Sequence, residues 1–233
     1  PVVRVPTRIA SNCVIHTMAC HRHKSEKYGA IVGEAIKASR QGRAVLIGTH
    51  SVAESQEIER RLQETKVSCE LLNGVQDADE ATVIAAAGQR GRITVATNLA
   101  GRGTDISLSS DVRDAGGLHV IVGQIHALAR VDRQLVGRSA RCGDPGSSRT
   151  FVAADDELLV EYAPWISRAI ERRCHDQNSE ATPAIVKAID QIQAECERAS
   201  ARQRISNLSI EMESESKLSS IPNSERPTAC WAL

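Results

Sequence analysis

Short apolar runs alternate with stretches of helical period over the first two thirds of the chain. The apolar runs are of the buried-strand type and occupy residues 44–48, 67–72, 92–97, 118–122 and 149–152. The helical stretches are predicted at residues 28–41, 51–64, 79–87 and 127–136. Continuous apolar strands separated by helices are typical of a mostly parallel sheet that is covered on both faces. The pattern therefore predicts the α/β fold class.

Parallel sheets of this class bind ligands just beyond the carboxyl ends of their strands. The loops that follow Gly48, Thr97 and Val122 are therefore the first places in which to expect a site. Ser51, with Glu54 three residues later, predicts a capping box at the start of the helix after the first of these loops.

The pattern changes after about residue 155. Pro164 interrupts a helical stretch, and Pro183 is well placed as the first residue of a long helix that carries one apolar stripe. We therefore predict four parts. They are an irregular lead-in at 1–24, the α/β lobe at 25–160, a helical segment at 161–218 and a disordered tail at 219–233.

Charge and composition argue against a nucleic-acid-binding protein. The chain of 233 residues has 29 basic and 29 acidic side chains, and only 2% of its residues are aromatic. It therefore lacks both the net positive charge and the stacking residues of such proteins. It has no apolar run of 18 residues, and its seven cysteines have irregular spacing, which predicts a cytosolic protein with reduced thiols. Because the chain begins with Pro1, we expect it to be a piece of a longer polypeptide.

The segment after the third apolar run carries the first candidate site. Gly101 and Gly103 flank Arg102 and allow the backbone to approach a ligand closely. Arg102 offers a planar set of donors that suits phosphate, and Thr104 and Asp105 suit a ribose or a water molecule. A plain surface turn with an exposed arginine is the alternative.

A second candidate lies between the last two apolar runs. Arg138 and Arg141 are three residues apart, so at a helix end they face the same way, and at the ligand edge of a sheet they would suit an anion. A solvated basic helix is the alternative. The lead-in contains Cys13, Cys20 and three histidines, but their spacing matches no zinc-finger pattern, so we predict no metal site.

Two motifs of a complete nucleotide-hydrolysing site are absent from the sequence. There is no G-x-x-x-x-G-K-[ST] segment to hold the β- and γ-phosphates, and no apolar strand ends in an Asp-Glu pair that could bind Mg²⁺. The acidic groups at 77–80 and 155–157 instead start helices.

Residues 96–106 and 134–146 together closely resemble the SecA family, the motor ATPase of bacterial protein translocation. Further similarity is found in residues 6–7, 24–28, 45–55, 115–121 and 183–205. The resemblance implies a RecA-like lobe, namely the second nucleotide-binding lobe of the motor, followed by the start of a helical scaffold. It implies that Asp105 contacts ATP and that Arg102, Arg138 and Arg141 act as arginine fingers opposite the γ-phosphate.

The resemblance also implies the cofactors and partners. ATP or ADP with Mg²⁺ would be shared with a first lobe that carries the two missing motifs, so the chain alone is expected to be inactive. A SecYEG-type channel and a preprotein would be the partners, at the cytoplasmic face of the plasma membrane.

The chain departs from the family at several positions. Gln124 replaces a Glu-like charge, Leu128 and Ala129 replace polar residues, Ala140 replaces a glycine and Cys142 replaces a glutamine. Two other interpretations therefore remain: the C-terminal lobe of a superfamily-two nucleic-acid helicase, or a degenerate interaction module without catalysis.

Overall fold

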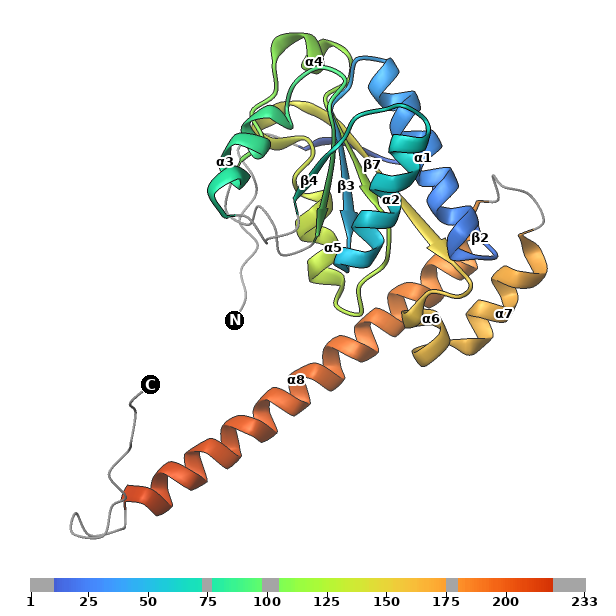
Figure 1. Ribbon diagram of the computed structural model, residues 1–233. Helices are drawn as coiled ribbons and strands as arrows, with labels where there is room; N and C mark the ends of the chain where they lie inside the picture. Colours follow the sequence, from blue (N-terminus) through green and yellow to red (C-terminus); the bar gives the residue numbers. More distant parts are fainter. Residues whose placement is uncertain (1–10, 73–76, 98–104, 175–179, 220–233) are drawn as a thin grey trace.

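A parallel sheet forms the centre of the molecule (Figure 1). The computed structural model describes residues 11–72, 77–97, 105–174 and 180–219. The strands are β1 (Asn12–Ile15), β2 (Ala19–His21), β3 (Val45–Thr49), β4 (Glu70–Leu72), β5 (Ile93–Thr97), β6 (Leu118–Val122) and β7 (Pro145–Ala153). Their order is β1-β7-β6-β3-β5-β4, and β2 pairs with the last residues of β7. Every pairing between these strands is parallel, which confirms the predicted fold class.

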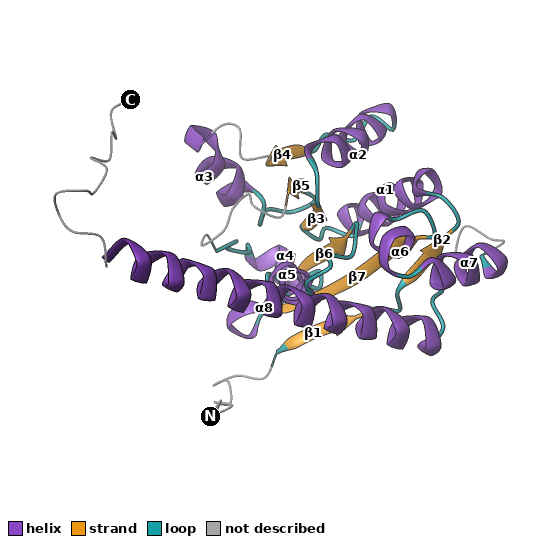
Figure 2. Ribbon diagram, turned by 90° about the horizontal axis from the view of Figure 1, so that it is seen from below, coloured by secondary structure: helices purple, strands orange, loops and turns teal. Residues whose placement is uncertain are grey.

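Helices cover both faces of the sheet because side chains alternate along the strands. On β3, Val45 and Ile47 pack under α1 (Lys24–Arg40) and α2 (Val52–Glu64). Leu46 faces the other side. That side is covered by α3 (Asp77–Ala86), α4 (Ser110–Asp114) and α5 (Ala129–Val136), as Figure 2 shows.

A third apolar cluster joins the sheet to the helices that follow it. These helices are α6 (Glu157–Tyr162), α7 (Pro164–Arg173) and α8 (Pro183–Ser219). Pro183 is the first residue of α8, as predicted, because proline lacks the N–H that a helix start leaves unpaired. Pro164, which was predicted to interrupt a helical stretch, separates α6 from α7 and is the first residue of α7. The first part of α8 is buried through Ile185, Ile189 and Ile192, and the rest projects away from the lobe (Figure 1).

The prediction of an irregular lead-in was wrong for residues 12–21. β1 and β2 lie there and extend the sheet alongside β7. β2 is fully buried and has only three residues, and β1 is mostly exposed, so neither shows an alternation that a sequence pattern could reveal. The helix α4 and the 3₁₀ turn at Arg141–Gly143 were also missed, because each is shorter than two helical turns.

Several predicted features lie outside the described residues. They are the polar break at 175–179, the tail from 220 onward, and the segment 98–104. Within the described residues, no helix combines the length and the apolar character that crossing a bilayer requires. The division into four parts stays a prediction.

Candidate functional site

The structure brings Asp105 and Arg141 together. Arg141 Nη1 lies 2.8 Å from Asp105 Oδ1, although the two residues are 36 positions apart in sequence. Arg141 Nε also donates to the carbonyl oxygen of Gly137 at 3.0 Å, which fixes the direction of the guanidinium. Both side chains remain partly exposed, at 41% for Arg141 and 59% for Asp105, so the pair is accessible to a ligand.

Arg138 belongs to the same group. Burial is the main cause that lowers the pKa of its guanidinium, and the charge of Arg141 lowers it further, while Asp105 opposes both effects. Arg141 is thus paired with Asp105, and Arg138 lies near enough to feel the charges of both. Guanidinium groups have the charge and the planar set of donors that suit an anion.

The backbone that carries Arg141 has an unusual conformation. Ala140 and Cys142 have φ angles of +53° and +54°, in the left-handed region that favours glycine. A Cβ atom added to Gly146 of β7 would lie 2.6 Å from the backbone nitrogen of Ala140. The turn is therefore held tightly against the start of β7, and Gly146 provides the room for it.

Strand β1 also contacts this turn. Asn12 Nδ2 donates to the carbonyl oxygen of Gly143 at 3.3 Å, and Cys13 Sγ lies 3.0 Å from Ser139 Oγ. The lead-in strand, which the sequence did not predict, thus helps to position the arginines.

The location of the pair differs from the predicted one. Gly146, beside Ala140, is paired with Leu118, which is the first residue of β6. The turn with Arg141 therefore lies near the amino ends of β6 and β7, on the face covered by α5, and not at the carboxyl edge. The reason is that α5 starts at the carboxyl edge and leads the chain back along the sheet before β7 begins.

Polar side chains fill the carboxyl edge after β3 and β6. His50 and His126 lie edge to face with ring centroids 5.0 Å apart, and burial lowers the pKa of His50 to about 4. Glu54 accepts hydrogen bonds from Tyr28 Oη at 3.1 Å and from the Gln124 amide at 2.8 Å, with the amide nitrogen turned toward it. The Glu54 carboxylate is thus held by partners from the protein itself.

The capping box predicted at Ser51 is confirmed in part. Ser51 Oγ accepts from the backbone N–H of Glu54 at 3.2 Å. The carboxylate of Glu54, however, accepts from the backbone N–H of His50, one residue before the usual donor.

A polar connection joins α5 to α8. Asp132 of α5 accepts from the backbone N–H of His126 at 3.1 Å, and Gln193 of α8 donates both to Asp132 Oδ2 and to the carbonyl oxygen of His126, each at 2.7 Å. Burial raises the pKa of Asp132 to about 6. One turn further along α8, Glu197 accepts from the backbone N–H of Arg130 at 3.3 Å. The only sequence signal for this connection is a glutamine at the edge of an apolar helix stripe.

Another acidic residue has a structural partner. Asp156, in the group read as a helix start, is the N-cap of α6 and forms a fully buried ion pair with Lys27 at 2.5 Å. Burial is the main cause that raises the pKa of Asp156. Across the described ranges, no group of three or more His, Cys, Asp or Glu side chains could hold a metal ion.

Four of the predicted site residues, Gly101, Arg102, Gly103 and Thr104, lie outside the described residues. The other three, Asp105, Arg138 and Arg141, are close together. Comparison with known protein families shows that residues 16–113 and 109–178 match the family model of the SecA P-loop domain. The chain belongs to the SecA family.

Relatives with related sequences are translocase subunits. The chain is 47% identical over 167 residues to the protein translocase subunit SecA 2 of Bordetella avium. The aligned residues cover 71% of this chain and 25% of that protein. It is 41% identical over 190 residues to the SecA 2 subunit of a Bacillus cereus strain. The aligned residues cover 79% of this chain and 24% of that subunit. This SecA chain thus spans about a quarter of the length of those relatives.

Solved structures of more distant proteins share the fold. The yeast DEAD-box splicing factor Prp28 aligns with a TM-score of 0.53 over 80% of this chain and 39% of its own, at 15% identity. The E. coli DEAD-box protein SrmB aligns with a TM-score of 0.51 over 68% of this chain and 85% of its own, at 19% identity. These likenesses show that the fold of the SecA chain is a RecA-like lobe.

Proposed function

We propose that this chain is the second ATPase lobe of a SecA-type motor, together with the start of its helical scaffold. In this proposal Arg102, Arg138 and Arg141 act on the phosphates of ATP, and Asp105 contacts the nucleotide. The observation that supports it is the grouping of Asp105, Arg138 and Arg141 in a partly exposed site of a SecA-family chain.

The chemistry of the site fits a polyphosphate. Arginine presents a planar, permanently charged set of donors, and an arginine placed against the charge that develops during phosphoryl transfer is worth roughly 10³–10⁵ in rate in other NTPases. Asp105 holds Arg141 until a ligand binds. A nucleotide phosphate would compete with that carboxylate and draw both guanidinium groups toward itself.

The phosphates themselves need a second lobe. The chain has no Walker-type loop and no strand that ends in an Asp-Glu pair, so ATP with Mg²⁺ would be held mainly by a first lobe, either in the same longer polypeptide or in a separate subunit. We propose a SecYEG-type channel and a preprotein as the further partners of the assembled motor.

The connection between α5 and α8 gives the lobe a route to its scaffold. α5 leads directly into the turn with Arg138 and Arg141, and Gln193 and Glu197 bond it to α8. A movement of the arginines toward a nucleotide would therefore pull on α8. ATP can bias an open against a closed arrangement in this way only because the arginines contact it in one of the two states.

The test combines this chain with a separately produced first lobe from the Bordetella avium relative. We expect neither part alone to hydrolyse ATP, and we expect the mixture to do so. Arg138→Ala and Arg141→Ala should each lower the rate of the mixture at least about 100-fold, as loss of a charge-stabilising group does.

Arg92→Ala is the matched control. Arg92 is also a partly exposed arginine in an ion pair, with Glu70 at 2.9 Å, but Glu70 is in β4, the edge strand on the opposite side of the sheet from β7. Its loss should leave the rate of the mixture unchanged. Turnover by the isolated chain that disappears in Arg138→Ala would show that no first lobe is needed, and equal losses in all three variants would remove the proposed role of the arginines.

A further inference from the structure

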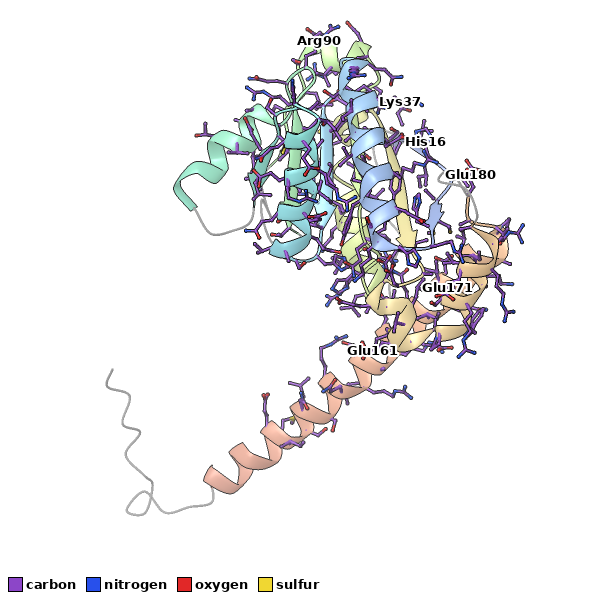
Figure 3. All side chains as sticks on the ribbon, turned by 45° about the vertical axis from the view of Figure 1, so that its right-hand side comes forward. His16, Lys37, Arg90, Glu161, Glu171 and Glu180 are labelled. Atoms are coloured by element: carbon purple, nitrogen blue, oxygen red, sulfur yellow. The ribbon has the colours of Figure 1, made fainter. Side chains whose placement is uncertain are left out.

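A groove lies between α1 and the edge of the sheet that carries β2. Its volume is about 560 Å³, which is in the range of small-molecule sites. One face of α1 forms a wall, β2 and β7 form the floor, and Glu180, which pairs with Ala19 of β2, lies at the outer side. Figure 3 shows Lys37 of α1 and Glu180 on the same side of the lobe. The turn with Arg141 lies on the other face of the sheet, so this groove is separate from the candidate nucleotide site.

Two glycines of α1 leave room for this groove. Gly29 and Gly33 lie inside the helix, about one turn apart, and both line the groove. Among the described residues, a Cβ atom on Gly33 would meet no atom within 4 Å beyond its own stretch of helix, and one on Gly29 would meet only Arg61 Nη1 at 3.9 Å. Glycine lowers the stability of a helix interior compared with alanine. Packing among the described residues does not require these glycines, so the space beside them is available to a ligand.

The floor of the groove contains a buried polar side chain without a partner. His21 is 1% exposed, and neither of its ring nitrogens has a hydrogen-bond partner among the described residues. Its ring stacks on that of Phe151 with centroids 6.0 Å apart, which fixes the ring. Burial lowers the pKa of His21, and a neutral imidazole has one donor and one acceptor to offer. Because buried polar groups are normally paired, His21 points to a ligand that bonds to it.

The charged side chains of the groove do not all neutralise one another. Glu34 and Arg149 form an ion pair at 3.2 Å. Within the described residues, Lys37 and Glu180 form no ion pair, and Glu26 accepts only from a backbone N–H, at 3.2 Å. Two carboxylates and one ammonium group thus remain for a ligand, and together they give the groove one net negative charge.

The opposite charges lie toward different ends of the groove. Glu26 and Lys37 are eleven residues apart on α1, which corresponds to about 16 Å along the helix axis. Glu180 pairs with Ala19, two residues before His21. The charge of Glu26 also acts on His21. Both carboxylates therefore belong to the end of the groove at which His21 lies, and Lys37 belongs to the other end.

We propose that this groove binds a free basic amino acid of the arginine or lysine class. Such a molecule has two cationic groups and one carboxylate, which complement the two glutamates and Lys37. Its carboxylate pairs with Lys37, its α-ammonium group with Glu180, and its cationic side-chain end with Glu26. The acceptor nitrogen of His21 can take a hydrogen bond from that end. A salt-bridge contact of about 3 Å at each end lets an extended basic amino acid span most of the groove.

Isothermal titration calorimetry of the whole chain with L-arginine tests the proposal. We expect one site per chain with a dissociation constant of about 0.1–1 mM, because a ligand of this size makes few contacts. Citrulline lacks the side-chain charge and agmatine lacks the carboxylate, so each should bind at least about 10-fold more weakly. The absence of saturable binding of both L-arginine and L-lysine up to about 10 mM would overturn the proposal, and so would equal affinities for L-arginine and citrulline.

Two pairs of variants locate the binding site. Lys37→Ala and Glu180→Gln should each weaken the binding of L-arginine at least about 5-fold, because each removes one of the complementary charges. Lys187→Ala and Glu171→Gln are the matched controls, since both residues are exposed on helices outside the groove, and they should leave the affinity unchanged. Equal affinities in all four variants would contradict binding in the groove.

Gly33→Leu tests whether the ligand occupies the space beside α1. The leucine side chain would fill that space, so the binding of L-arginine should fall at least about 10-fold. Leucine favours a helix more than glycine does, so α1 should remain formed, which circular dichroism checks. Unchanged binding in a folded Gly33→Leu variant would overturn the proposal. The ATPase test above does not involve these residues, so the two proposals stand or fall separately.

Discussion

Leu135 of α5 lies directly over Gly48 of β3. A Cβ atom built on Gly48 would come within 2.1 Å of Leu135 Cδ2, so the absence of a side chain at Gly48 lets α5 approach the sheet this closely. Because α5 leads into the turn with Arg138 and Arg141, this contact sets the position of the proposed arginine fingers. The last residue of the first predicted strand thus acts on the site through packing rather than by touching a ligand.

Replacing Gly48 by alanine should therefore force the Leu135 side chain out of its position against the sheet. We expect Gly48→Ala to lower the free energy of unfolding by about 1–3 kcal/mol, as overpacking does. Leu135→Ala should remove the clash, so the double variant should lose less than the sum of the two single variants by about 1 kcal/mol or more. Urea unfolding of the four proteins measures this coupling, and additive losses would show that the two side chains do not meet.

Replacing Ala140 by glycine should stabilise the folded protein. Its φ of +53° costs an L-residue about 1–2 kcal/mol, whereas glycine adopts it freely but loses more chain entropy on folding. We expect Ala140→Gly to raise the free energy of unfolding by about 0.5–1 kcal/mol.

Ala169→Gly is the comparison for Ala140. Ala169 is exposed on the right-handed helix α7, where glycine should lower the free energy of unfolding by about 1 kcal/mol. Opposite signs at the two positions, measured by thermal unfolding, would confirm the left-handed turn. A loss at both positions would contradict it.

The fold could be predicted where strands are buried on both faces. The runs around Val45, Ile93 and Leu118 are continuous and apolar, so their type and order followed from hydrophobicity alone. β1 and β2 could not be found in this way, because their stability comes from pairing with β7, more than 120 residues away. Local pattern contains no information about such a partner.

The sequence named the residues of the candidate site but did not predict where in the fold they lie. Residue type and spacing made Asp105, Arg138 and Arg141 candidates, and the resemblance to the SecA family implied their roles. Their position near the amino ends of the strands depends on the direction of α5 and on the left-handed turn at Ala140, and neither leaves a signal when alanine occupies that position. Gln193 was not selected because its partners, Asp132 and the backbone of His126, are more than 60 residues away.

Gln124 should not tolerate replacement by glutamate. Its buried amide faces the carboxylate of Glu54, so Gln124→Glu would bring two carboxylates together and raise the pKa of at least one of them. We expect the free energy of unfolding to fall by about 1–3 kcal/mol at pH 7.5 and to recover toward pH 5, because the folded state then binds the extra proton. Adding Glu54→Gln to this variant should restore stability at pH 7.5, and unfolding curves at the two pH values test both statements.

Asp132 should make the protein less stable as the pH rises. Burial raises the pKa of this carboxyl from 3.8 to about 6 in the folded state, so between these values the folded protein binds more protons than the unfolded chain. The contribution of Asp132 to the free energy of unfolding is therefore greatest below pH 3.8. This contribution falls by up to about 3 kcal/mol as the pH rises through 6, since each pKa unit corresponds to about 1.4 kcal/mol.

Asp132→Asn removes the titration and keeps an oxygen that can accept from the backbone N–H of His126. The difference in the free energy of unfolding between wild type and variant should therefore shift in favour of the variant as the pH rises from 4 to 7. Urea unfolding across that range measures it. A pH-independent difference for Asp132→Asn would mean that the carboxyl ionises in the folded protein as it does in water, and that Gln193 contacts a solvated charge.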